Sequence, residues 1–491
     1  MAIEPDPRSK WDPAEIRRVA HRVADLLADY LEALPERPVF APVPVDDAAR
    51  FAAEPLPATG SEPEAILDDF TRSVGPYPFG NGHPRFWAWV NSPPAVMGIF
   101  AEALAAAMNP SVAGGNHAAV HVEREVIRWF AEMLGLPATA MGLLVSGGSM
   151  ANLTALAAAR HAKAGFDVRV RGLQSGDQRL VIYMSEEGHG CIRKAAEMMG
   201  IGSESVRVVP VNERLEMRVD VLADTIDRDL QAGYRPIAVA ANAGTVNTGA
   251  IDDLEAIARV CRERGVWLHV DGAYGAAAIL STNYRNRLAS LALADSIALD
   301  PHKWLYVPVE AGLVLVRDAA NLRSTFSLVP PYLRTDGDPH GVGGPPWFSE
   351  FGFQQSRGFR ALKVWMTLKY YGVSGYTSAI DHDLALASYL ADRVNADADW
   401  ELMAPPSLSI VCFRAVPAGV VGDERLNDLN KYVLERLQLS GRAFLSSTVL
   451  HGRFVLRACI VNPLSAQHDV DAMLETLKTI AREAARRLAV S

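Results

Sequence analysis

A glycine-rich segment, Ser146-Gly147-Gly148-Ser149, stands between a predicted strand and a predicted helix and has the features of an anion site. Glycines let the backbone come close to an anion, and the start of a helix offers free N–H groups and the positive end of its dipole. Ser149 adds a hydroxyl, so the segment suits a phosphate group. A tight turn capped by a serine also accounts for these residues. The spacing matches neither the dinucleotide fingerprint nor the Walker loop.

Asp271 and Lys303 each follow an apolar predicted strand. A carboxylate in such a place needs a partner. The protonated nitrogen of a pyridine ring would suit Asp271, and the small Ala273 leaves room for the ring. Burial lowers the pKa of an amine and makes it nucleophilic towards carbonyl carbons, which is what a Schiff-base lysine such as Lys303 requires. A helix cap or salt bridge also explains Asp271, and a surface amine also explains Lys303.

Two more polar side chains follow predicted strands: His189 could stack on a flat ring, and Thr245 could hydrogen-bond a ring substituent. Each is also an ordinary loop residue when taken alone. In an open α/β sheet, ligands bind at the carboxyl ends of the strands. We therefore expect the phosphate segment, the ring stacker, the acid and the amine to meet at one edge, and together they indicate pyridoxal phosphate.

The elements that must position these residues form an alternating pattern of strands and helices between residues 85 and 372. Helices such as Met150–Ala164 and Leu254–Arg264 separate most of the strands, which predicts a mostly parallel sheet covered on both faces. The predicted strands are Leu143–Val145, Leu180–Met184, Val206–Val209, Ile237–Ala240, Trp267–Val270, Ser296–Leu299 and Leu313–Val316.

Two further regions flank this large domain. Residues 1–84 form a helical segment whose first helix carries an apolar stripe, and we expect it to pack on a partner subunit. The proline-rich stretch Pro35–Pro57 is expected to lack regular structure. Residues 373–491 form a small α+β domain. Its expected elements are Thr377–Ala396, Leu408–Phe413, Glu424–Gln438, Ala443–Thr448, Phe454–Ile460 and Val470–Leu488.

The composition of the 491 residues excludes several classes of protein. A net charge of −9 gives no electrostatic reason to bind nucleic acid or an anionic membrane. No secretory signal or membrane span is apparent, and the four cysteines are too scattered for a zinc site or a disulfide framework. We expect a cytoplasmic protein with reduced cysteines and no metal.

Four motifs resemble those of the pyridoxal-phosphate-dependent group II decarboxylases, specifically the aromatic-L-amino-acid decarboxylase family. The resemblance extends from about Trp11 to Leu488. His269-Val270-Asp271-Gly272-Ala273-Tyr274 resembles H-V-D-A-A-Y, and Pro301-His302-Lys303-Trp304 matches P-H-K-W; the segments His83–Trp89 and Phe359–Trp365 resemble H-P-x-F-x-A-[YW] and F-R-[AS]-L-K-x-W.

The resemblance implies a fold-type I homodimer, like aspartate aminotransferase, that binds pyridoxal phosphate and decarboxylates an L-amino acid. It also implies a role for each matched residue. Lys303 would hold the cofactor as a Schiff base, Asp271 would pair with the ring nitrogen, His189 and Ala273 would lie on the two ring faces, Gly148, Ser149 and His302 would bind the phosphate, Thr245 would support the ring, and Tyr332 would return a proton to the substrate carbon.

Three departures from the family pattern bear on the cofactor and the substrate. Val246 replaces a second threonine, Asp300 replaces an asparagine beside the lysine, and Asn91-Ser92 replaces Pro-Thr at the substrate pocket. The aromatic side chains of Phe86, Trp87 and Trp89 at the pocket wall favour an aromatic substrate, although a place in the core also accounts for each of them. The alternatives are an acidic amino acid, an aldehyde synthase in which oxygen intercepts the carbanion, and a protein that binds the cofactor without catalysis.

Overall fold

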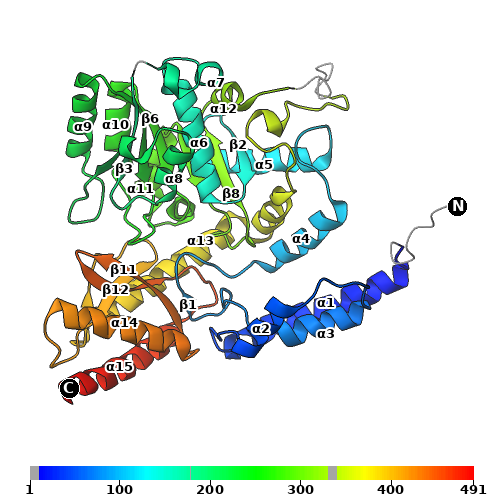
Figure 1. Cartoon of the computed structure of the whole chain (residues 1–491), viewed down its shortest axis with the longest axis vertical. Helices are drawn as coiled ribbons and strands as arrows, with labels where there is room; N and C mark the ends of the chain where they lie inside the picture. Colours follow the sequence, from blue (N-terminus) through cyan, green and yellow to red (C-terminus); the bar gives the residue numbers. More distant parts are fainter. Residues whose placement is uncertain (1–9, 177, 330–339, 491) are drawn as a thin grey trace.

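A seven-stranded sheet forms the centre of the large domain in the computed structural model, which describes residues 10–176, 178–329 and 340–490 (Figure 1). The strand order is β2-β8-β7-β6-β5-β3-β4, and only β8 runs antiparallel to its neighbours. All seven predicted strands are confirmed. They are β2 (Met141–Val145), β3 (Leu180–Ser185), β4 (Val206–Val209), β5 (Arg235–Asn242), β6 (Trp267–Asp271), β7 (Ser296–Leu299) and β8 (Gly312–Val316).

The strands of this sheet are largely buried because helices cover it. Every residue of β2, β3, β6, β7 and β8 is buried, as expected for strands with both faces covered. Helix α6 packs along β5 to β8, while α9 and α10 pack on β5. The helices of this domain are α5 (Ala118–Met133), α6 (Gly148–Lys163), α7 (Val168–Arg171), α8 (Cys191–Met198), α9 (Val219–Gln231), α10 (Leu254–Arg264), α11 (Arg285–Leu288) and α12 (Ala319–Phe326).

The small domain has a five-stranded sheet in the order β1-β11-β12-β10-β9. Its first strand comes from far away in the sequence, because Phe86 pairs in parallel with Phe444. The chain just after residue 84, expected to begin the large domain, therefore joins the small one first. The elements are β1 (Phe86–Trp87), β9 (Trp400–Leu402), β10 (Ile410–Ala415), β11 (Phe444–Leu450), β12 (Arg453–Cys459), α13 (Arg360–Asn395), α14 (Asp423–Leu439) and α15 (Gln467–Val490).

Helix α13 crosses the expected boundary between the two domains. It bends at Gly372, whose φ of +61° is not helical and suits a residue without a side chain. The expected boundary therefore lies at the bend itself.

The N-terminal helices project away from the rest of the chain (Figure 1). They are α1 (Pro13–Ala33), α2 (Val45–Ala53) and α3 (Pro63–Ser73), followed by α4 (Val96–Met108). The expectation that Pro35–Pro57 lacks regular structure is wrong, because α2 forms within it. Pro44 is the residue that caps α2, a place where a missing N–H costs nothing. No residue of α1 is buried.

A buried ion pair ties α5 to the segment before α13. The Arg357 guanidinium contacts the Glu123 carboxylate, and both side chains are almost fully buried. Arg357 also donates to the carbonyl oxygens of Leu144 (2.6 Å) and Val112 (3.0 Å), while Glu123 accepts from Leu144 N at 3.0 Å. The pair thus clamps both backbone groups of Leu144, two residues before the glycine-rich segment begins.

None of the helices in the described ranges is long and apolar enough to cross a membrane. The four cysteines are buried and unpaired.

Candidate active site

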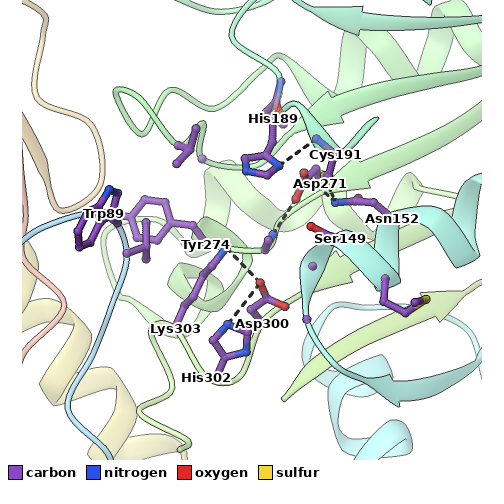
Figure 2. A pocket seen from close by; sticks show the side chains of 18 of the residues that line it. Trp89, Ser149, Asn152, His189, Cys191, Asp271, Tyr274, Asp300, His302 and Lys303 are labelled. Carbon is purple, nitrogen blue, oxygen red and sulfur yellow. Dashed lines mark hydrogen bonds and ion pairs between the residues drawn. The ribbon is translucent and has the colours of Figure 1, made fainter. Parts of the chain in front are cut away.

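A cavity of about 430 Å³ opens at the carboxyl ends of β5, β6 and β7. Figure 2 shows the side chains of His189, Asp271 and Lys303 converging on it, with Trp89 towards one end and Ser149 towards the other. The residues of the sequence-based prediction that line the cavity are Trp89, Gly148, Ser149, His189, Asp271, Ala273, His302 and Lys303.

The glycine-rich segment forms a cradle at the start of α6. Gly147 has a φ of +151°, a conformation open mainly to glycine. A β-carbon on Gly148 would lie only 2.8 Å from Asp300 Oδ2 and 3.1 Å from Ala273 Cβ. The close approach therefore requires glycine, and it leaves the first N–H groups of α6 facing the cavity beside Ser149. A phosphate group fits this donor set.

Asp271 is the last residue of β6, and its carboxylate accepts hydrogen bonds on both oxygens. Ala273 N donates to Oδ1 at 3.1 Å and Asn152 Nδ2 donates to Oδ2 at 3.0 Å. Asp271 is only 8% exposed, so little water reaches it. One carboxylate edge remains directed at the cavity, where a ring N–H could donate to it.

Asn152 is itself held by a buried chain of hydrogen bonds whose direction follows from chemistry. Trp267 Nε1 donates to Ser296 Oγ at 2.8 Å, and that hydroxyl lies 2.9 Å from His269 Nδ1. Asn152 Nδ2 donates to Asp271, so Asn152 Oδ1 can only accept. Burial lowers the pKa of His269 to about 4, so the ring is neutral and carries its proton on Nε2. That nitrogen donates to Asn152 Oδ1, which orients the Asn152 amide towards Asp271.

Lys303 Nζ lies 3.1 Å from Asp300 Oδ2 and faces the cavity. Burial disfavours the charged amine, but the carboxylates of Asp300 and Asp271 outweigh it and raise the pKa of Lys303. The expectation of a lowered pKa is therefore wrong for this arrangement of charges, because it did not include the contact with Asp300.

His189 lines the cavity with a defined tautomer. Its Nδ1 accepts from Cys191 N at 3.2 Å, so the ring proton lies on Nε2. His302 lies nearby, with Nδ1 2.7 Å from Ala311 O and Nε2 3.9 Å from Asp300 Oδ2. Both rings leave one nitrogen available to the cavity.

Two predicted residues do not line the cavity. Thr245 is buried, its hydroxyl 3.2 Å from that of Thr248, and it accepts from Ala250 N. Its neighbours Gly244 and Val246 face the cavity instead. Thr245 therefore stabilises a turn, and the cavity wall here is a valine.

Ser92 donates to His302 O at 3.3 Å and lines a neighbouring hollow of about 320 Å³. Asn91 is the residue of this pair that reaches the main cavity. Tyr332, the expected proton donor, lies outside the described residues.

The mouth of the cavity is aromatic on one side. Trp89 is 45% exposed, and its ring centre lies 5.4 Å from that of Phe79 and 6.0 Å from that of Phe444. Phe86 and Trp87 do not line the cavity. Both are almost fully buried, which agrees with the alternative that they are core residues. The aromatic rings of Trp and Tyr that line the cavity are therefore those of Trp89 and Tyr274.

Arg457 of β12 joins the two sides of this mouth. Its guanidinium donates to the carbonyl oxygens of Trp89 (2.8 Å), Val246 (2.5 Å) and Asn247 (2.9 Å). Arg457 is 3% exposed. Its guanidinium is hydrogen-bonded to backbone carbonyl groups and does not line the cavity.

Sequence reasoning missed several residues that line the cavity: Asn152, Cys191, Asn242 and Tyr274. Asn152 could have been predicted, because it lies one helical turn after Gly148 on the same face of the helix. The others depend on contacts between distant segments.

Comparisons with known proteins point to one family. The model described as the pyridoxal-dependent decarboxylase conserved domain matches residues 47–416. An aromatic-L-amino-acid decarboxylase of Bacillus atrophaeus is 36% identical over 96% of this chain and 96% of its own length. A phenylacetaldehyde synthase of Arabidopsis thaliana is 30% identical over 96% of each chain. The crystal structure of Oryza sativa TDC with PLP and tryptamine has a TM-score of 0.89 at 28% identity and covers 98% of this chain and 99% of that one.

Proposed function

The chain belongs to the pyridoxal-dependent decarboxylase family, and from that premise we propose that it removes the carboxylate of an aromatic L-amino acid as carbon dioxide and releases the amine. The observation that carries the proposal is the meeting of three groups in one cavity. These are an anion cradle that excludes any β-carbon, a buried carboxylate with an open edge, and an amine.

These residues fit pyridoxal phosphate, and we assign them the following parts. Gly148, Ser149 and His302 would hold the phosphate, and Lys303 would bond the aldehyde carbon. Asp271 would face the ring nitrogen, and His189 and Ala273 would lie on the two ring faces. Thr245 would support the ring only through the turn that it stabilises.

The chemistry divides between the cofactor and the chain. When bound, pyridoxal phosphate supplies a cationic ring that takes up the electron pair left as carbon dioxide departs. Asp271 holds a proton on the ring nitrogen, and Asn152 keeps that carboxylate in place. His189 covers the site and presents its Nε2 proton to the cavity. On the family resemblance, Tyr332 donates the proton that the substrate carbon receives.

The charges around the cavity favour an aromatic over an acidic substrate. No arginine lines the cavity among the residues that the structure describes, and the nearby Arg457 is taken up by three carbonyl groups. A second carboxylate on the substrate would thus meet Asp271 and Asp300 without a matching arginine. Trp89, Val90 and Val246 instead offer aromatic and apolar surface.

A panel of L-amino acids tests the proposal. We expect carbon dioxide and amine in equal amounts from tryptophan, tyrosine or phenylalanine, with at least about tenfold lower kcat/KM for glutamate and aspartate, since burying an unpaired charge costs more than 1.4 kcal/mol. Oxygen uptake should be measured in the same reactions. Aldehyde and peroxide in place of amine would show an aldehyde synthase instead, and the absence of carbon dioxide release would refute the proposal.

We also propose a cytoplasmic homodimer, which four buried and unpaired cysteines and two exposed apolar surfaces support. The first surface lies on α1 and α3, where Val23, Leu67 and Phe70 line a hollow of about 840 Å³. The second is a stripe on α4 at four-residue spacing, formed by Val96, Phe100, Leu104 and Met108. In a two-fold arrangement each chain could cover the α4 stripe of the other with its own N-terminal helices.

Deletion of residues 1–60 should therefore turn the dimer into a poorly soluble or inactive monomer, as measured by light scattering and turnover. The double variant Phe100→Glu/Leu104→Glu should also dissociate the dimer, although it leaves α1 intact, because it places charges in the second surface. A stable and fully active monomer after the deletion would contradict the proposal.

A further inference from the structure

Asp300 is a buried carboxylate at the wall of the phosphate cradle. Its residue is only 3% exposed, and its backbone N donates to Ala273 O at 3.1 Å. Oδ2 lies beside the start of α6, where a β-carbon on Gly148 would come within 2.8 Å of it. Oδ1 is buried and has no hydrogen-bond partner. A buried carboxylate oxygen without a partner is costly. The position of Oδ1 therefore indicates that a ligand binds here.

Few charges balance this carboxylate. Lys303 contacts it at 3.1 Å, and the His302 ring lies 3.9 Å away. Asp271 on β6 adds negative charge, and burial raises the pKa of Cys191 on α8 to about 12, so that thiol is neutral. His189 lies across the cavity. The first two turns of α6 and the whole of β8 bring no ionisable side chain.

Binding of the cofactor changes this balance. The phosphate brings up to two negative charges to the cradle that Asp300 borders. At the same time the Lys303 amine, now bonded to the cofactor, no longer offers three N–H donors to Oδ2. Two like charges a few ångströms apart in a buried site favour a proton on one of them.

We propose that Asp300 takes up a proton when the cofactor binds, and that the resulting acid donates a hydrogen bond to the phosphate. The proton goes to a carboxylate oxygen and no other bond changes at this residue. Asp300 is thus a positioning residue that couples retention of the cofactor to pH, and affinity falls as pH rises because binding consumes a proton. The inference rests on the cofactor site proposed above.

The test compares apoenzyme of the unchanged chain with Asp300→Asn, whose amide is already a neutral donor of the same shape. Dissociation constants for pyridoxal phosphate should be measured from pH 6 to 9. Titration calorimetry in buffers of different ionisation enthalpy then counts the protons bound. Asp318→Asn is the matched control, because it removes the same charge at an exposed helix cap where asparagine serves equally well.

As pH rises, the affinity of the unchanged protein for the cofactor should fall, and each pH unit should cost it about tenfold more than it costs Asp300→Asn. The unchanged protein should bind one more proton per cofactor than this variant. Asp300→Asn should bind more tightly at pH 9, and Asp318→Asn should match the unchanged protein. Equal slopes and proton counts in all three would overturn this inference alone. Failure of all three folded proteins to bind the cofactor would overturn the proposed function as well.

Discussion

Asp271→Asn is expected to lower kcat by about two to three orders of magnitude while the protein still binds its cofactor, a loss typical of removing one group that stabilises developing charge. Asparagine has the same shape and keeps a hydrogen bond with Ala273 N. It lacks the charge that holds a proton on the ring nitrogen, so the ring is a weaker acceptor of electrons. Steady-state turnover with the best substrate gives the loss.

The control for this variant changes Asn152, which donates a hydrogen bond to Asp271. Asn152→Ala leaves the Asp271 charge in place and removes one donor, so a loss of about tenfold is expected, the worth of one hydrogen bond to a charged group. A pH titration of the visible absorption of the bound cofactor separates the two, because only Asp271→Asn should move it strongly. Near-normal turnover in Asp271→Asn would mean that the carboxylate is only a structural cap.

Arg357→Met is expected to destabilise the protein by about 3 to 5 kcal/mol, since it leaves the Glu123 carboxylate buried without its partner. Glu123 Oε2 already lacks a hydrogen-bond partner, so the carboxylate has only Leu144 N left to satisfy it. The two Leu144 and Val112 carbonyl groups would lose their donor as well. Urea unfolding followed by fluorescence measures the loss.

Two comparisons make this result specific. Arg128→Met removes one partner of the exposed pair with Glu132 and should change stability little. The double variant Glu123→Leu/Arg357→Met should recover part of the loss, because no charge is then left buried. If Arg357→Met were as stable as Arg128→Met, the buried pair would contribute nothing to the fold.

The large sheet could be predicted because its strands are buried on both faces and appear as short, mostly apolar runs. β1 and β9 could not, since two and three residues are too few to show a period. Helix α2 was missed because prolines on either side suggested a loop. Pro44 is the N-cap residue of this helix, and proline is tolerated at the start of a helix.

The site was predictable to the extent that each residue follows a strand. Strand ends meet at one edge, so Asp271, Lys303 and the glycine-rich segment came out together. Sequence could not show which way a side chain turns after the strand ends, and so Thr245 and Ser92 were expected in a cavity that Val246 and Asn91 line. The pKa of Lys303 was missed for a similar reason, because it depends on the contact with Asp300.

Arg457 makes the entrance to the cavity a shared property of the two domains. One guanidinium on β12 is bonded to the carbonyl of Trp89 on one rim and to those of Val246 and Asn247 on the other. The spacing of the two sides is therefore set by a side chain that does not line the cavity. Selection for enzymes that accept bulkier amino acids should therefore recover substitutions in the strands that carry and flank Arg457, as well as in the cavity wall. Libraries confined to the cavity wall would not vary the spacing of the entrance.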